Sequence, residues 1–558
     1  MYLRKIVENP DTRTALEIGM ISLLHKKSVI HFFYTFFLVL FLGLIECFLT
    51  KNSIVSIGFS KYFESYLLVF ILFYLCLLSG YKTFSLIVTN FIIYIIGSNI
   101  VFLTYFGRLL MPYDISQFFY EFVDIIGGLS GGIKIFLIPL CLYLILIIVN
   151  TIYIFKYVKN KEMGYKKYLF FIIAVSGLIG VMVPALKGKI FENNLHYPVV
   201  RNTINCISSF LIEGSKSLFS VAEVKKKYPK YNVKNIDAGQ DFNVIVVVGE
   251  STTFKHLGLY GYERQTTPFL SSLDGKSGFK HFYGISRGFS TRIGVPLLLN
   301  VIYEPDNVDQ LLSMQTNLFT LAKNTGRNTL YLSNQKSGVL ASLVNTKDID
   351  QFHDVFSKEM PENTTDMRLI ELIEKKKYVL EEAPYFMVLH QRNSHFAYNE
   401  NYPQAYNFYK GGKDEFSKLI DTYDNSMHFQ DDFFKALRAS AQKVSSKPTL
   451  IFYTSDHGEL FGENGLWGHG TPILQSAAVP ILMFGINGAE KWVDDIQYSH
   501  CYMSNYELGK IVAASLGREI TNPNENNNQI FININLPLDG SSKFTEVKVE
   551  EAKALCLQ

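Results

Sequence analysis

Apolar residues are concentrated in the first third of the chain, in long stretches with almost no charge. Each stretch matches the roughly 17–25 residues that a helix needs to cross the hydrocarbon core of a membrane. Helices on the surface of a soluble protein have a polar face, and these have none. We therefore expect five transmembrane helices. Their apolar runs are Val29–Ile45, Ser65–Tyr81, Thr83–Gly107, Ile135–Phe155 and Tyr168–Leu186.

The basic residues between these runs predict their orientation, because Lys and Arg are enriched in short cytoplasmic loops. The stretch before the first run and the connection between the fourth and fifth runs are each rich in Lys and Arg, whereas segments 51–64 and 108–134 are poorer. The N-terminus is therefore expected in the cytoplasm, and everything after Leu186 outside it. The first run begins late, after 28 mixed residues, which favours a permanent signal anchor over a cleaved signal peptide.

From Asp241 onward the pattern changes to short β-branched apolar runs separated by amphipathic segments. Such runs indicate a parallel sheet covered by helices on both faces. The expected helices include Met367–Lys377 and Phe416–Ala439. The expected strands are Asn243–Val248, Thr329–Leu332, Tyr385–Leu389, Thr449–Tyr453 and Pro480–Phe484.

These patterns divide the chain into three parts. We expect a five-helix transmembrane domain over 1–190 and an exported α/β domain with a parallel-rich sheet, sandwiched by helices, over 237–558. Between them, 191–236 has basic and amphipathic stretches, including Asn202–Leu211. This composition is typical of an interfacial connector that lies on the membrane surface.

Composition agrees with a membrane part fused to a soluble part. Only 18% of the 558 residues are charged, below the roughly 25% of an ordinary soluble protein. The net charge of +3 gives no reason to expect a nucleic-acid partner. Three of the six cysteines fall in the exported part, so at most one intramolecular disulfide can form there, and we expect no disulfide scaffold. We expect the protein to be a monomer.

Metal-ligating side chains follow two of the expected strands. Glu250 comes directly after the first, and Asp456 and His457 follow Thr449–Tyr453. In α/β sheets, functional groups gather beyond the carboxyl ends of strands. Carboxylate and imidazole groups are ligands that zinc accepts. If the backbone turns sharply at Gly458, the three side chains can converge on one ion.

Further histidines also stand at or after strand ends. The strand Tyr385–Leu389 runs directly into His390, and His395 follows shortly after. His469 lies in a glycine-rich loop after Asp456. This concentration favours a site that handles a metal or a phosphate.

A nucleophile is expected in the loop 286–296, which enters a helix. A hydroxyl at a helix start meets unpaired N–H groups and the positive end of the helix dipole, which favour a bound phosphate. An adjacent metal would make that hydroxyl a stronger nucleophile. The spacing alone leaves Ser290 and Thr291 as equal candidates.

Taken together, these motifs resemble the bacterial phosphoethanolamine transferases of the alkaline phosphatase/sulfatase superfamily. The resemblance covers nearly the whole chain. It is carried by the run ending in Gly249-Glu250-Ser251, by Leu259-Tyr260-Gly261-Tyr262-Glu263-Arg264-Gln265-Thr266-Thr267-Pro268, by His390 with Ser394-His395, and by Ser455-Asp456-His457-Gly458-Glu459 with Gly462-Glu463-Asn464-Gly465 and His469-Gly470.

The resemblance implies a zinc enzyme of the bacterial inner membrane with its catalytic domain in the periplasm. It assigns Thr291 as nucleophile, because Thr291 lies five residues before Pro296. It places one tight zinc ion on Glu250, Thr291, Asp456 and His457. His390, His395 and His469 match positions that bind substrate phosphate or a second zinc during turnover. Asn334 and Lys336 match a substrate-contacting loop.

The implied reaction transfers phosphoethanolamine from phosphatidylethanolamine, through a covalent threonine intermediate, to lipid A or a core sugar of lipopolysaccharide. Transfer to lipid A would weaken the binding of polymyxin. In lipid A-modifying members, cysteines flank the nucleophile loop, where this chain has Arg287 and Leu297, so the acceptor stays open. The aromatic-rich segment Pro112–Ile126 is expected either to position the donor head group or to anchor the interface.

Two other functions remain as alternatives. A phosphoglycerol transferase of the lipoteichoic-acid synthase type would share five helices, a threonine nucleophile and one metal. The Glu463-Asn464-Gly465 stretch and the His390/His395 pair favour a phosphoethanolamine transferase over a phosphoglycerol transferase. A non-catalytic membrane scaffold is the second alternative, and it predicts normal function without Thr291. A sulfatase is disfavoured, because no Cys/Ser-x-Pro-x-Arg sequence lies near Thr291.

Overall fold

The computed structural model describes most of the chain, and the statements below concern these residues only. They are residues 10–50, 59–107, 109–110, 114–115, 122–158, 198–211, 228–237, 241–304, 307–336, 346–471, 473–526, 529–533, 544–548 and 552–553. The chain divides into two compact units, one formed by Met1–Ile125 with Gly132–Leu218, the other by Ile126–Gly131 with Phe219–Gln558.

The first unit is helical. Its helices are α2 (Pro10–Thr50), α4 (Phe59–Leu78), α5 (Lys82–Phe106), α7 (Phe122–Tyr157) and α9 (Val199–Ser209). Four spans are long and apolar enough to cross a membrane, namely Ser28–Leu49, Phe59–Leu78, Lys82–Phe106 and Phe136–Tyr157. These correspond to the first four predicted runs. The fifth run, Tyr168–Leu186, and most of the segment Pro112–Ile126 lie outside the described residues, so a count of five stays a prediction.

Buried polar side chains connect the membrane helices. Asn150 on α7 donates to Thr89 Oγ1 and Asn90 Oδ1 on α5, both at 2.7 Å. Glu46 on α2 accepts from Tyr66 on α4 at 2.6 Å and from the backbone N–H of Val199 at 3.0 Å. The last contact satisfies an N–H at the start of α9, and Val199 itself is buried among the membrane helices. Most of the amphipathic stretch Asn202–Leu211 thus lies in α9, which packs against α4 and α5. Its position on the membrane surface stays a prediction.

The second unit is built on an eight-stranded sheet with the order β11-β3-β10-β7-β2-β6-β4-β5. Five of the seven pairings in this sheet are parallel. In chain order, its strands are β2 (Asn243–Gly249), β3 (Phe279–Ile285), β4 (Asn328–Ser333), β5 (Gln351–His353), β6 (Tyr385–His390), β7 (Thr449–Ser455), β10 (Ala478–Ile486) and β11 (Tyr502–Ser504).

Two features of this mixed sheet differ from the prediction. β10 runs antiparallel to both β3 and β7. The connection from β7 to β10 contains only two-residue strands and 3-10 turns. It has no crossover helix to carry the chain back along the sheet, so β10 starts at the edge where β7 ends. β3, β5 and β11 were not predicted. Lys280, His281 and Gly284 interrupt the apolar residues of β3, and β5 and β11 are only three residues long.

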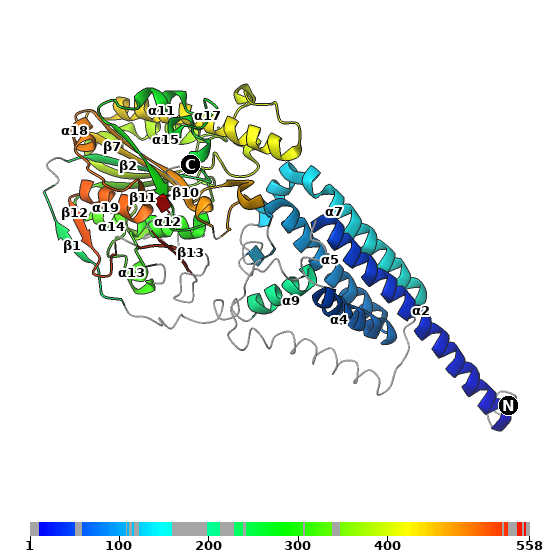
Figure 1. Cartoon of the computed structure of the whole chain (residues 1–558). Helices are drawn as coiled ribbons and strands as arrows, with labels where there is room; N and C mark the ends of the chain where they lie inside the picture. The colour runs from blue at the N-terminus through cyan, green and yellow to red at the C-terminus, as the bar shows by residue number, and fades with distance from the viewer. Residues whose placement is uncertain are drawn as a thin grey trace. The chain divides into compact units, whose positions relative to one another are not determined.

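Helices cover both faces of the sheet, as predicted (Figure 1). Val244, Val246 and Val248 of β2 pack toward α12, α14 and α19, whereas Ile245 and Val247 pack toward α11, α15 and α17. This alternation explains the continuous apolar sequence of β2. The helices are α11 (Pro268–Leu273), α12 (Thr291–Leu299), α13 (Val308–Ser313), α14 (Leu318–Lys323), α15 (Met367–Lys375), α16 (Lys377–Glu382), α17 (Glu415–Val444), α18 (Glu490–Asp494) and α19 (Asn505–Ser515).

Three small antiparallel sheets complete the unit. The first pairs β1 (Asn232–Asn235) with β12 (Arg518–Thr521), the second β8 (Leu460–Phe461) with β9 (Trp467–Gly468), and the third β13 (Gln529–Asn533) with β14 (Phe544–Lys548). The β8–β9 hairpin carries His469 at its end. β13 packs near the loop before α12, since Ile530 and Ile532 share a core with Phe289.

Candidate active site

Two neighbouring parallel strands bring the predicted metal ligands together. β2 and β7 pair in register, with Gly249 opposite Ser455, so Glu250 and Asp456 leave the same edge of the sheet side by side. Ligand atoms of Glu250, Asp456 and His457 all lie within 4.8 Å of one another, and all three side chains are buried.

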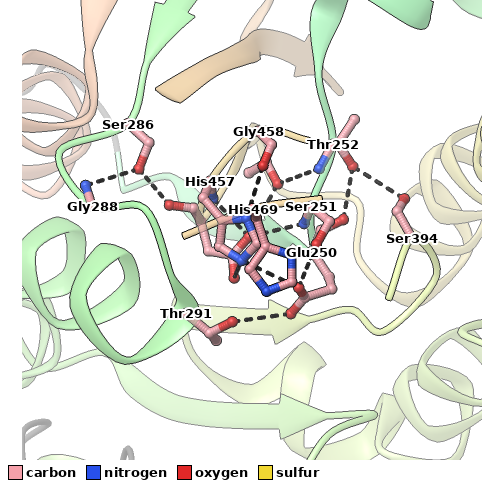
Figure 2. Close-up of polar contacts among 12 residues, drawn as sticks. Glu250, Ser251, Thr252, Ser286, Gly288, Thr291, Ser394, His457, Gly458 and His469 are labelled. Carbon is pink, nitrogen blue, oxygen red and sulfur yellow. Dashed lines mark hydrogen bonds and ion pairs between the residues drawn. The ribbon is translucent and has the colours of Figure 1, made fainter. Parts of the chain in front are cut away.

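Thr291 completes this group. It is the first residue of α12, and its Oγ1 donates to Glu250 Oε2 at 3.2 Å (Figure 2). Ser290, the other candidate nucleophile, caps the helix, and its Oγ is buried without a hydrogen-bond partner. The structure therefore places Thr291, rather than Ser290, against the ligand group.

The spacing of these atoms fits a tetrahedral ion. His457 Nε2 lies 3.4 Å from Glu250 Oε1 and 3.4 Å from Asp456 Oδ2. Four ligands at the zinc distance of ~2.0–2.1 Å are about 3.3 Å apart. Asp456 Oδ2 and His457 Nε2 are also buried without a hydrogen-bond partner. Such atoms are costly unless something coordinates them, so the four residues fit a zinc ion.

The backbone around the ligands is held by local hydrogen bonds. Ser251 has a positive φ of 52°, which is uncommon for a residue other than glycine. This conformation lets the Ser251 N–H donate to Asp456 Oδ1 at 3.1 Å, while the next N–H donates to Ser455 Oγ at 2.8 Å. His457 Nδ1 donates to the Gly458 carbonyl at 3.0 Å, which leaves Nε2 for a metal.

The chain bends at Asp456 and His457, directly before Gly458. Gly458 has no positive φ, so it does not supply a left-handed turn. A Cβ at this position would lie 2.6 Å from the Ala478 carbonyl oxygen. Glycine is therefore needed because the backbone of β10 passes close by.

Gly294 is required by a similar close approach. A Cβ on Gly294 would lie 2.2 Å from the Asp456 carbonyl oxygen. The first turn of α12 thus packs directly on the backbone that carries the ligands, and this contact brings Thr291 within reach of Glu250.

The charges of Glu250, Asp456 and His457 depend on one another. Burial opposes a charge on His457, but Asp456 and Glu250 raise its pKa to about 10. Burial and the charge of Glu250 raise the pKa of Asp456 to about 6. Burial alone would raise the pKa of Glu250, yet the contact with His457 holds it well below its usual value. A proton on His457 thus takes the place of a cation at neutral pH.

The other predicted histidines surround this group in different ways. His469 Nδ1 donates to Glu459 Oε2 at 3.0 Å, and the rings of His469 and His457 are 4.4 Å apart. His395 Nδ1 donates to the Phe396 carbonyl at 2.6 Å. Burial lowers the pKa of His395 and lowers that of His390 to about 4, so both are neutral at neutral pH.

Glu459 was not predicted as a functional residue, although it follows His457 by two positions. Its carboxylate is buried, accepts from Tyr398 at 2.6 Å and orients His469. Together His457, Glu459 and His469 form a second group of side chains that could hold a metal ion.

The loop after β4 places Gln335 in the site, between the two predicted residues. Gln335 Nε2 donates to Glu250 Oε2 at 2.8 Å and to the Gln391 carbonyl at 2.6 Å. Asn334 instead donates to Asp366 Oδ1 at 2.8 Å, and Lys336 is exposed. Substrate contacts of Asn334 and Lys336 stay a prediction.

Comparison with known proteins agrees with this site. Residues 242–516 match the sulfatase family model, so this part of the second unit is similar to the sulfatase family. This stretch includes every predicted site residue.

Similar proteins include several phosphoethanolamine transferases, which confirms the resemblance drawn from the motifs. The chain is 28% identical over 246 residues to the Kdo(2)-lipid A phosphoethanolamine 7''-transferase of Salmonella typhimurium, covering 42% of each protein. It is 26% identical over 302 residues to the phosphatidylethanolamine transferase Mcr-1 of Escherichia coli, covering 50% of this chain and 55% of Mcr-1. The chain thus aligns with about half the length of these relatives.

The whole fold also resembles a solved membrane protein. Lipooligosaccharide phosphoethanolamine transferase A from Neisseria meningitidis superposes with a TM-score of 0.56 at 18% identity. The match covers 86% of this chain and 95% of that structure. A helical unit followed by a sulfatase-type domain is therefore a fold shared with a known protein.

Proposed function

We propose that this protein is a membrane-anchored phosphoethanolamine transferase. Its donor is phosphatidylethanolamine, and its acceptor is lipid A or a core sugar of lipopolysaccharide. The observation that carries the proposal is the contact of Thr291 Oγ1 with Glu250 at 3.2 Å, beside two His457 contacts of 3.4 Å. This arrangement places one hydroxyl in a group of atoms that fits a divalent cation, and the named relatives supply the chemical group transferred.

Glu250, Thr291, Asp456 and His457 would hold one tight zinc ion. When bound, zinc lowers the pKa of a coordinated hydroxyl and neutralises negative charge on phosphoryl oxygens. His469 with Glu459 would hold substrate phosphate or a second ion.

Thr291 acts as the nucleophile. Its Oγ1 loses its proton and attacks the phosphorus of the donor, the bond from phosphorus to the diacylglycerol oxygen breaks, and that oxygen takes up a proton. Diacylglycerol leaves, and phosphoethanolamine stays on Thr291. The N-terminal position of Thr291 on α12 directs backbone N–H groups toward the phosphate. In the second half of the reaction, an acceptor oxygen attacks the same phosphorus and Thr291 leaves.

The histidines manage charge and protons around the phosphate. His395 and His390 are neutral at neutral pH, so neither repels a cation. His395 donates through Nδ1 to the Phe396 carbonyl, which leaves Nε2 as an acceptor or metal ligand. Both ring nitrogens of His390 contact neighbouring side chains, those of Tyr331 and Gln335. Glu459 fixes the ring of His469 through Nδ1, which leaves the lone pair of Nε2 free to ligate a second ion. Such an ion would neutralise the charge that builds up on the phosphoryl oxygens in the transition state.

Both proposed substrates are lipids, which explains why the catalytic unit is tethered to apolar helices. The distribution of Lys and Arg supports a cytoplasmic N-terminus and a catalytic unit on the periplasmic side of the inner membrane. This orientation puts Thr291 on the side of the membrane where lipopolysaccharide is modified.

The proposal is tested by mass spectrometry of lipid A and core oligosaccharide from cells with the gene, without it, and with Thr291→Ala. Added phosphoethanolamine that requires both the gene and Thr291 is the expected result. Transfer of glycerol phosphate from phosphatidylglycerol would instead support the phosphoglycerol alternative. Normal cellular function with Thr291→Ala would support the scaffold alternative.

A further inference from the structure

Arg287 is an unusual residue for a loop beside a nucleophile. It is only 2% exposed and is among the largest fully buried side chains of the described residues. No carboxylate of the described residues forms an ion pair with it. Its hydrogen bonds go to backbone carbonyls. Nη1 donates to Ile302 at 2.9 Å, Nη2 donates to Tyr303, and Nε donates to Phe531 at 2.7 Å.

Two of these bonds join the two ends of the nucleophile helix. Arg287 lies four residues before Thr291, where α12 begins, and Ile302 and Tyr303 lie just after its end at Leu299. The side chain therefore closes residues 287–303 into a loop around α12. Because the guanidinium is planar and rigid, all its bonds form only when the carbonyls are correctly placed.

The third bond reaches a strand outside the sulfatase-family match. Phe531 belongs to β13, which begins thirteen residues after the match ends at 516. The same segment is tied to the far end of the loop, since Tyr303 Oη donates to the carbonyls of Asn526 and Gln529 at 2.9 and 3.0 Å. Ile530 and Ile532 of β13 also pack with Phe289.

We infer that Arg287 and β13 form a clamp that positions Thr291 for attack. The inference rests on the proposed role of Thr291 as nucleophile. A buried guanidinium is costly unless its N–H groups are satisfied, so the clamped arrangement is strongly preferred over others. Since Arg287 does not contact the reacting atoms, it is a positioning residue, and β13 makes the C-terminal segment part of the active-site architecture.

Arg327 provides a matched control. It is also buried, at 4% exposed, and donates to the carbonyl of Phe242 and to Thr325. It precedes β4, so it lies at the edge of the sheet opposite the ligands. Loss of Arg327 removes similar interactions without touching α12.

The test compares four variants, all purified in detergent with the helical unit retained. They are Arg287→Met, Arg327→Met, a chain ending at residue 526, and the combination of the first and third changes. The readouts are kcat and KM for phosphoethanolamine transfer, zinc content, and amide hydrogen exchange of α12. We expect Arg287→Met to lower kcat by about 100-fold with little change in KM or zinc content, and to speed exchange in α12. The truncation should do the same, and the combination should lose little more.

Arg327→Met should keep kcat and α12 exchange near those of the unchanged protein. Equal losses of kcat in the two Met variants, or unchanged α12 exchange in Arg287→Met, would overturn the clamp. If Arg287→Met does not fold, Arg287→Lys provides the comparison, and unchanged kcat and exchange there would also overturn it. If the unchanged protein transfers nothing, the proposed function fails, while the exchange data still decide whether the clamp exists.

Discussion

Thr291 Oγ1 lies 3.2 Å from Glu250 Oε2, although 41 residues separate them in the chain. Thr291 starts α12 and Glu250 directly follows β2, so their contact depends on how that helix packs across the edge of the sheet. The chemistry proposed for this protein requires both residues at one ion, and the packing of α12 against the sheet brings them together.

Replacing the nucleophile should separate chemistry from folding. We expect Thr291→Ala to reduce transfer by at least about 1,000-fold, because no other hydroxyl contacts Glu250 Oε2 among the described residues. Thr291→Ser should retain measurable transfer, since it keeps the oxygen. Thermal unfolding of both variants should stay close to that of the unchanged protein. Full activity of Thr291→Ala would remove Thr291 as nucleophile.

Zinc binding should release protons, and its pH dependence follows from the ligand pKa values. His457, with a pKa of about 10, is protonated at neutral pH without metal, and zinc must displace that proton. The apparent affinity should therefore fall about tenfold for each pH unit lowered between pH 10 and 6. Below about 6, Asp456 also takes up a proton, and the fall should become steeper.

Calorimetry of zinc binding at pH 7 in buffers of different ionisation enthalpy measures this release. The expected value is about one proton per ion. A heat of binding that does not depend on the buffer would contradict the proposed ligand set. His457→Gln should bind zinc weakly and without the pH dependence seen above pH 6.

Gly294→Ala tests the close packing of α12 on the ligand backbone. The added methyl group would meet the Asp456 carbonyl at 2.2 Å, so α12 must move away. We expect a loss of about 1–3 kcal/mol in the free energy of unfolding and a clear fall in kcat. Gly411→Ala is the control, because nothing lies within 4 Å of a Cβ there. Equal activity of the two variants would show that α12 tolerates displacement.

Gln335 and Lys336 should affect different steps. Gln335→Leu removes the donor to Glu250 Oε2, and loss of a residue that orients a ligand typically weakens metal affinity about 10- to 100-fold. Lys336→Gln should leave zinc affinity unchanged and raise KM for the donor if Lys336 contacts the phosphate. Zinc titration and steady-state kinetics on both variants distinguish these effects. Unaltered zinc affinity in Gln335→Leu would exclude the positioning role of Gln335.

The proximity of the candidate metal ligands could be predicted from sequence, because they follow apolar strands directly. Parallel strands end at one edge, so Glu250 and Asp456 meet whenever β2 and β7 are neighbours. The same reasoning does not predict which residue of the loop after β4 enters the site. Successive side chains at a strand end point in opposite directions, and nothing in the residue types indicates that Gln335, rather than Asn334, turns toward Glu250.

Other features depend on contacts between distant segments. From the sequence alone, Arg287 would be predicted to be an exposed loop residue. Its partners Ile302, Tyr303 and Phe531 become its neighbours only after folding. The positive φ of Ser251 follows from hydrogen bonds across two strands. The antiparallel direction of β10 reflects a missing crossover helix, which apolar composition does not reveal.

The most direct test of the account is to trap the covalent intermediate. The purified protein is mixed with phosphatidylethanolamine without acceptor, quenched in acid, digested and analysed by mass spectrometry. The account predicts one phosphoethanolamine group on Thr291, lost when acceptor lipid is added before quenching and absent in Thr291→Ala. A group found on Ser290 instead, or transfer that proceeds with no modified peptide, would contradict it.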